Sequence, residues 1–170
     1  MTSLIDKKEK FSMDEFFKDK KPSPPPKGKQ KIMEKYTKLV MKKLYGKDIL
    51  VFFYAAETPF VMEYRGIFRD ESITPYLSRD YPVWAKDPKC SVTYSRLLYE
   101  PDELAPHAWD TIVHEVTHYE GGVKSVNWEI RHTAKFYKTL KRNFEKVDDL
   151  RKQFYKEVGW EEDFVYSEED

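Results

Sequence analysis

The sequence predicts an α+β domain, and three observations support that prediction. A long segment with helical spacing comes first, three short segments rich in β-branched and aromatic residues follow, and strong helical segments come last. Grouping of strands and helices along the chain in this way is typical of α+β folds. With 170 residues, 35% of them charged and 16% aromatic, we expect one globular domain with a well-filled core.

The two ends of the chain are expected to lie outside this domain. Residues 1–28 are interpreted as a disordered arm and linker, because the stretch KDKKPSPPPKGKQK is too rich in proline and lysine to bury apolar area. The domain itself is expected to span residues 29–160. Residues 161–170 are interpreted as an acidic tail.

The first helix is expected from about Lys29 to Tyr45, and Gly46 marks its end. Apolar and aromatic residues recur in this segment at three- and four-residue steps, at Ile32, Met33, Tyr36, Leu39, Val40 and Leu44. Strands are expected in DILVFFYA, in FVMEYRGIF and in CSVTYSRLLYE, which begin at residues 48, 60 and 90.

The next helix is expected from Pro106 to Glu120. Proline is well placed in a first helical turn, and Gly121 with Gly122 ends the segment. The residues expected to face the core are Trp109, Ile112, Val113 and Val116. A further helix is expected over about 127–144, with Asn127 as its N-cap, followed by more helix towards Trp160.

The stretch TIVHEVTHYEGG carries the strongest chemical signal. His114 and His118 are four residues apart, so on a helix their imidazoles can reach a single point, as two ligands of a zinc ion must. Glu115 projects beside that point without being a ligand. From there it could take a proton from a water on the metal and later deliver it to a leaving amine. This is the H-E-x-x-H pattern of zinc peptidases.

A catalytic zinc needs a third protein ligand, and the candidates downstream are Glu120, Glu129 and His132. We favour His132, with Glu129 as the fallback ligand or as a group that orients an imidazole. In the expected helix His132 shares one face with Trp128, Phe136 and Leu140. His107 lies roughly 10 Å before His114 along the helix axis, too far to share the metal, and is expected to be exposed.

The HExxH region of the chain resembles a known family. The stretches LLYEPDELAPHAWDTIVHEVTHYEGG and RHTAKFYKTL are similar to the SprT-like zinc metallopeptidases, which include the Spartan proteases that digest proteins crosslinked to DNA. In that family an HExxH helix follows a strand and a short polar loop, and a third histidine stands in a His-Gly-x-x-aromatic setting. Here His132 takes that place, with Phe136 and Tyr137 after it, and the departure is Thr133 in place of glycine. The Wss-type metallopeptidases have a much shorter gap and fit less well.

The resemblance covers roughly residues 30–145. It implies a minimal zincin-like fold, in which a small antiparallel sheet of about three strands packs with an N-terminal helix and an HExxH helix hairpin. It also implies Zn²⁺ as the cofactor, protein as the substrate and Glu115 as the catalytic residue. One cysteine cannot build the zinc ribbon that often follows the domain in the family. We further expect the strand around Ser91–Tyr94 to pair with an extended substrate as an edge strand.

The N-terminal arm contains a second motif, KFSMDEFFK. Its spacing resembles that of the PIP box, a peptide that binds replication sliding clamps, and the motif residues are Lys10, Met13, Phe16 and Phe17. Lys10 stands where the motif usually has glutamine. The alternative interpretation is an amphipathic segment that packs on this protein's own domain.

Charge is unevenly distributed although the net charge is zero. Up to Lys47 the chain has 14 lysines against six acidic residues, so this basic half could contact the phosphates of DNA, or it could be only a solvated surface. The single Cys90, the absence of a long apolar run and a start without an apolar signal region predict an intracellular protein with no membrane contact. We expect a monomer in the cytoplasm, or in the nucleus of a eukaryote.

Two classes of function follow from these observations. The first is a zinc-dependent endopeptidase that cleaves protein, including protein attached to DNA. The second is a non-catalytic zincin-like binding or adaptor protein that engages a sliding clamp or DNA. The presence of Glu115 favours the enzyme, because a purely structural zinc site has no need of a carboxylate there.

Overall fold

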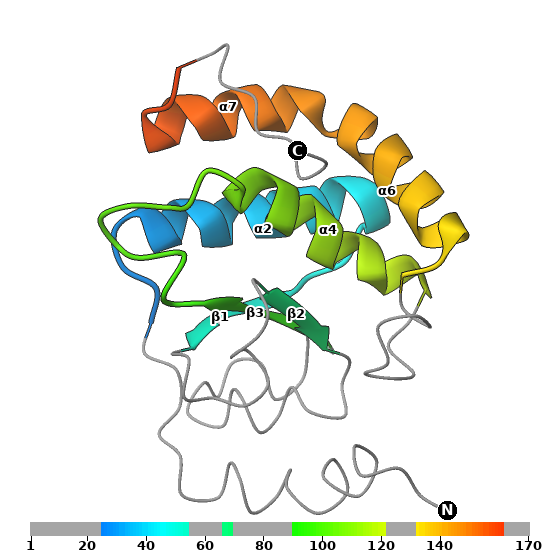
Figure 1. The fold of residues 1–170 in the computed structure, drawn as a ribbon, viewed down its shortest axis with the longest axis horizontal. Coiled ribbons are helices and arrows are strands. Elements are labelled where there is room, and N and C mark those ends of the chain that lie inside the picture. The colour runs from blue at the N-terminus through cyan, green and yellow to red at the C-terminus, as the bar shows by residue number, and fades with distance from the viewer. Residues whose placement is uncertain (1–24, 55–65, 70–89, 122–131, 162–170) are drawn as a thin grey trace, which may run out of the picture.

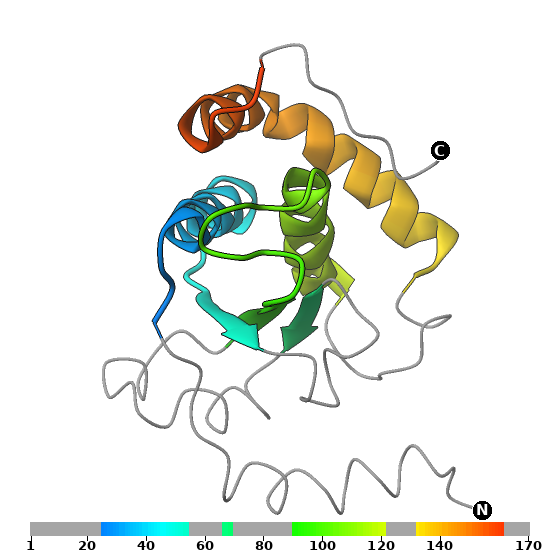
Figure 2. The ribbon, with the colours of Figure 1, turned by 60° about the vertical axis from the view of Figure 1, so that its left-hand side comes forward.

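The structure is a computed structural model that describes residues 25–54, 66–69, 90–121 and 132–161. Its elements, in chain order, are α2 (Lys29–Tyr45), β1 (Leu50–Tyr54), β2 (Gly66–Arg69), β3 (Ser91–Ser95), α4 (Ala108–Gly121), α6 (Ala134–Lys146) and α7 (Asp148–Val158). The expected α+β class is therefore confirmed. Helices α2 and α4 lie side by side over one face of the sheet, and α6 and α7 lie beyond them, away from the sheet (Figure 1). Figure 2 shows the same order of layers from a second direction.

The sheet is mixed, so the expectation of an antiparallel sheet is wrong for one of its two strand pairs. The strand order is β1-β3-β2. Strand β2 pairs antiparallel with β3, with Ile67 opposite Thr93, whereas β1 runs parallel to β3, with Phe52 opposite Thr93. A parallel pair needs a long connection between its strands, and the stretch from Tyr54 to Ser91 supplies one. The pattern of residues within each strand does not reveal which strand lies in the middle.

This order also overturns the proposed role of Ser91–Tyr94 as a substrate-binding edge strand. Strand β3 is central, and its backbone groups are paired with β1 on one side and with β2 on the other. All five of its residues are buried. An extended peptide cannot add to a strand that already has two neighbours.

Helix α2 has the bounds that the sequence predicts. Gly46 ends it in the left-handed conformation, with φ 66°, and donates its N–H to the carbonyl of Lys42. Met33, Tyr36 and Val40 face the core as expected. Leu39, however, is exposed, and Met41 is buried instead. The buried stripe is thus rotated slightly from the one that the sequence indicates.

The start of α2 is tied to the loop that leads from β3 to α4. The N–H of Lys29 donates to the carbonyl of Pro101 at 2.8 Å, and the side chain of Gln30 donates to the carbonyl of Tyr99 at 2.9 Å. Gly28, at φ 51°, allows this approach, because a Cβ there would lie 2.4 Å from the Pro101 oxygen. The loop before α4 is therefore fixed by the first helix of the domain.

The core lies between the sheet and the helices. The stripe on α4 expected from the sequence, Trp109, Ile112, Val113 and Val116, is fully buried. Trp109 packs against Phe154 of α7, with the ring centroids 5.5 Å apart. Among the described helices, none combines the length and the apolar character that a membrane crossing would require.

We predict that Gly28→Ala destabilises the domain more than Gly46→Ala. Both glycines have positive φ, but only Gly28 has a backbone oxygen where the new methyl group would go. Gly46→Ala should cost roughly 1 kcal/mol from backbone strain alone. Gly28→Ala should cost about 1–3 kcal/mol, because Pro101 must also move. Urea unfolding of the two variants measures the difference, and equal losses would contradict the close approach to Pro101.

A second prediction concerns pH and the contact between α2 and α7. Lys35 donates to the Glu157 carboxylate at 2.7 Å and the Tyr36 hydroxyl donates to it at 2.8 Å. Both bonds lower the pKa of Glu157 below its ordinary value of 4.5, and the bond from Lys35 has the larger effect. A carboxyl group whose pKa is lower in the folded state stabilises the fold above its unfolded pKa, and this contribution is lost as the pH falls through the folded pKa.

Glu157→Gln should therefore be less stable than the natural chain at pH 7, and this difference should shrink on acidification below about pH 4. The comparison needs urea unfolding of both proteins at each pH, because other carboxyl groups also titrate in this range. A difference that stays constant from pH 7 to pH 3 would show that the charge of Glu157 does not matter.

Candidate metal centre

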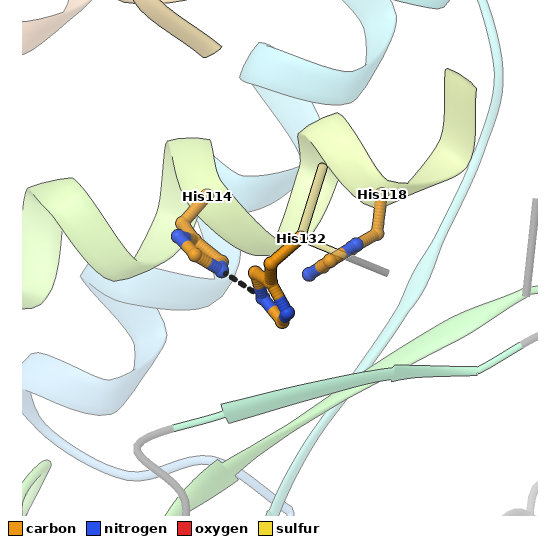
Figure 3. Close-up of side chains that lie close together, drawn as sticks. All are labelled: His114, His118 and His132. Carbon is orange, nitrogen blue, oxygen red and sulfur yellow. Dashed lines mark hydrogen bonds between the residues drawn. The ribbon is translucent and has the colours of Figure 1, made fainter. Parts of the chain in front are cut away.

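Three histidines from two separate segments meet at one point. His114 and His118 lie one turn apart on α4, and His132 lies directly before α6. Figure 3 shows the three side chains turned toward one another. The Nε2 atoms of His114 and His132 are 3.0 Å apart, and one ligand atom from each of the three rings lies within 4.8 Å of the others. The three predicted ligands are thus brought together, and they form a site that could hold a metal ion.

The two faces of α4 explain how two of these rings are presented. The apolar stripe with Trp109 and Val113 is fully buried in the core. His118 is buried as well, while His114 is half-buried. Burial of the apolar side fixes the rotation of the helix about its axis. The rings of His114 and His118 then contact those of His132 and Phe136.

His132 reaches α4 from outside a helix, which corrects the expectation of a helix running from Asn127 through His132. Thr133 has extended backbone angles, φ −84° and ψ 169°, and its hydroxyl accepts the N–H of Phe136 at 3.2 Å. It is the N-cap of α6, so the described helix begins only at Ala134. Thr133, the departure from the glycine of the resembling family, therefore has a structural role of its own.

Phe136 contacts all three imidazoles. Its ring stacks on His118, with centroids 4.4 Å apart and an interplanar angle of 18°. It meets His114 and His132 edge to face, with centroid distances of 5.1 and 5.2 Å. Phe136 is itself buried. The sequence places it on the inner face of its helix, and the structure adds that it forms an apolar wall against all three rings.

The donor set suits a metal such as zinc. In a tetrahedral site with zinc–nitrogen bonds of about 2.0–2.1 Å, neighbouring nitrogens are about 3.3–3.4 Å apart. The separation of 3.0 Å between His114 and His132 and the outer limit of 4.8 Å lie on either side of that spacing. Within the described residues the converging group consists of three histidines, and imidazole nitrogens are among the ligands that zinc takes.

Glu115 is buried on the same helix, directly after His114. It is not among the residues whose ligand atoms converge. Its charge acts on the wholly buried Tyr94 of β3: burial is the main cause that raises the pKa of this phenol well above its ordinary value, and Glu115 adds to the effect. The carboxylate of Glu115 thus lies within electrostatic range of the strand beneath α4.

His107 is buried, and the expectation that it is exposed is wrong. Its Nδ1 lies 2.8 Å from the hydroxyl of Tyr99, which also bonds Thr111 at 2.7 Å. The turn before α4 folds back on Tyr99, which forms a β-bridge with Leu104. This turn places His107 against Tyr99, and helical spacing alone could not indicate that contact. His107 is not part of the converging group, as its distance from His114 predicts.

The remaining candidates have the following positions. Glu120 accepts hydrogen bonds from Tyr45 and Arg142 and does not join the three histidines. Glu129, the fallback ligand, lies outside the described residues. So do the residues of the clamp-binding motif, namely Lys10, Met13, Phe16 and Phe17.

Comparison with protein families, with curated proteins and with solved structures finds no match to this chain. The resemblance to SprT-like metallopeptidases therefore rests on the HExxH helix and the third histidine, together with their order along the chain.

We predict that His118→Ala and His132→Ala weaken zinc binding to a similar degree, because each removes one of three ligands. Zinc affinity should fall by about 100-fold or more. Loss of a group that only hydrogen-bonds to a ligand already lowers metal affinity by about 10- to 100-fold, and loss of the ligand itself should cost at least as much. His107→Gln is the matched control, since it changes the one histidine outside the group and should leave zinc affinity unchanged.

Zinc competition titrations at constant pH measure these affinities, and circular dichroism checks that each variant is folded. Full zinc affinity in His132→Ala would exclude His132 as a ligand. Loss of affinity in Glu129→Ala instead would assign the third position to that carboxylate.

Proposed function

We propose that this protein is a zinc-dependent endopeptidase. The observation that carries the proposal is the convergence of His114, His118 and His132, with Glu115 next to the first of them on the same helix. Three imidazoles leave one position of a tetrahedral site for substrate or water, and a neighbouring carboxylate provides a base.

In this proposal His114, His118 and His132 hold the ion, and Phe136 keeps their rings in place. When bound, zinc supplies Lewis-acid chemistry, polarising a carbonyl group and acidifying water. Zinc is preferred because imidazole nitrogens are borderline ligands, whereas calcium and magnesium prefer oxygen ligands.

Glu115 is the proposed general base and general acid. Its carboxylate would accept a proton from the water that attacks the peptide carbonyl carbon. As the carbon–nitrogen bond breaks, the same group would return that proton to the leaving amine nitrogen. Glu115 is buried, so its charge is shielded from bulk water, which strengthens its action on nearby groups.

The arrangement of elements supports the minimal zincin-like fold as part of this proposal. Helix α2 precedes a small sheet, and the helix with the HExxH motif packs over that sheet, as the resemblance implies. The parallel pair of β1 and β3 is the point at which the sheet departs from the expected antiparallel one.

The substrate class is proposed from the resemblance: protein that is bound or crosslinked to DNA. Contact of the basic N-terminal half with DNA and docking of the arm on a sliding clamp belong to the same proposal, as does an intracellular or nuclear location. Part of the basic charge of α2 is already matched within the fold, since Lys35 pairs with Glu157 and Lys43 with Asp149. DNA contact would therefore depend on the remaining lysines.

We predict that Glu115→Gln keeps the fold and the zinc but loses peptide cleavage by about 10²–10⁴-fold. Glutamine has nearly the same shape as glutamate and leaves the imidazoles untouched, yet it cannot accept a proton. The measurement is cleavage of casein and of a DNA-binding protein, with zinc content determined on the same samples. Glu145→Gln, on the exposed side of α6, is the matched control and should cleave normally.

The outcomes separate the two classes of function. Glu115→Gln with near-normal cleavage would show that Glu115 is not the base. A natural chain that binds zinc through its three histidines but cleaves no protein would favour the adaptor alternative.

A further inference from the structure

Helices α2, α4 and α6 meet in a group of hydrogen-bonded polar side chains beside the histidines. We call this group the junction network; its members are Tyr45 of α2, Thr117 and Glu120 of α4, and Arg142 and Asn143 of α6. None of its residues is one of the three converging histidines. Thr117 and Glu120, however, flank His118 closely on the same helix.

Asn143 is the centre of the network and is only 1% exposed. Its amide nitrogen donates to the hydroxyl oxygens of Tyr45 and Thr117, each at 3.0 Å. Both hydroxyls donate their own hydrogens to other groups. Thr117 donates to the carbonyl of Val113, and Tyr45 donates to the carboxylate of Glu120. The group of Asn143 that faces them must therefore be the NH₂, because two acceptors need a donor. The direction of every bond is determined.

The outer part of the network is charged. Arg142 donates to both carboxylate oxygens of Glu120, at 3.2 and 2.9 Å. The hydrogen bond from Tyr45, and then that from Arg142, lower the pKa of Glu120. Burial first, and the bond to Glu120 second, raise the pKa of Tyr45 to about 12, so the phenol keeps the proton that it donates.

Helix α6 is thus held against α4 at two points. Phe136 packs on the imidazoles at its start, and Asn143, seven residues later on the same buried face, bonds Thr117. Apolar contacts tolerate sliding of one helix on another, whereas a hydrogen bond weakens once its length or angle departs from a narrow range. A shift by one residue would move α6 by about 1.5 Å and break both bonds of Asn143.

We propose that the junction network positions the third metal ligand, by fixing the register of α6 against α4 so that His132 meets His114 and His118. The residues of the network are positioning residues, and none of them belongs to the converging group of ligand atoms in the described residues. This inference rests on the proposed metal site, and it assigns to Asn143 and Thr117 a role in metal affinity that neither the HExxH motif nor the third histidine implies.

The test measures metal binding by the full-length chain, with zinc competition for affinity and the visible absorption of bound Co²⁺ for ligand geometry. Asn143→Leu keeps the size of the side chain and removes both donors. Thr117→Val removes the acceptor, and Thr117→Ser restores the hydroxyl. We expect Asn143→Leu and Thr117→Val to bind zinc roughly 3- to 30-fold more weakly, with an altered Co²⁺ spectrum, and Thr117→Ser to bind like the natural chain.

Val158→Ala controls for stability alone. Val158 is buried in α7 and belongs to neither the network nor the metal site, so its truncation should lower the melting temperature without changing the Co²⁺ spectrum. All affinities are measured well below each variant's melting temperature. If Asn143→Leu does not fold, Thr117→Val and Arg142→Gln carry the test.

Unchanged zinc affinity and Co²⁺ spectra in the folded network variants would overturn the inference and leave the network with a purely structural role. This result is distinguishable from failure of the metal site itself, because in that case His118→Ala and His132→Ala would also bind zinc like the natural chain.

Discussion

Helix α4 has to bury one side in the core and still present two imidazoles on another. Its apolar residues, Trp109 and Ile112 among them, are buried, and this burial fixes the rotation of the helix about its axis. His114 and His118 are then aimed by helical geometry alone, because residues four apart lie one above the other. The rest of the domain holds this helix in place from both ends and from both sides.

The loop before α4 contributes the first of these constraints. It is tied to α2 through Pro101 and Tyr99, and Tyr99 also bonds His107 and Thr111 at the start of α4. A single tyrosine therefore connects the first helix, the loop and the site-bearing helix. A buried polar cluster of this kind restricts the arrangement of its neighbours, because an unpaired hydroxyl or imidazole in the core would cost free energy.

The third imidazole depends on a different set of contacts. His132 stands outside the helix, and its position follows from the Thr133 cap, from the packing of Phe136 and from the register of α6. Phe136 and Asn143 lie on the same face of α6 and hold it against α4 by two kinds of interaction. Phe136 stacks on His118, and Asn143 donates a hydrogen bond to Thr117. Together they account for how α4 and the separate segment before α6 bring three imidazole nitrogens within 4.8 Å of one another.

Local signals in the sequence were sufficient for several features. The bounds of α2, its end at Gly46, the buried stripe of α4 and the pairing of His114 with His118 all depend on residues within a turn or two of one another. Spacing and residue type also pointed to His132 as the partner of that pair. Capping, helical periodicity and ligand chemistry act over short distances, so the sequence displays them directly.

Other features depended on contacts between distant segments and became visible only in the tertiary structure. The central place of β3 and its parallel pairing with β1 follow from which strands meet, and alternation within a strand contains no information about its neighbours. Burial of His107 depends on its contact with Tyr99. The start of α6 after Thr133 depends on the Thr133 hydroxyl, which accepts the N–H of Phe136. The sequence by itself determined which side chains could bind a metal; only the packing of α6 on α4 decided that they meet, because their convergence depends on the register between two helices.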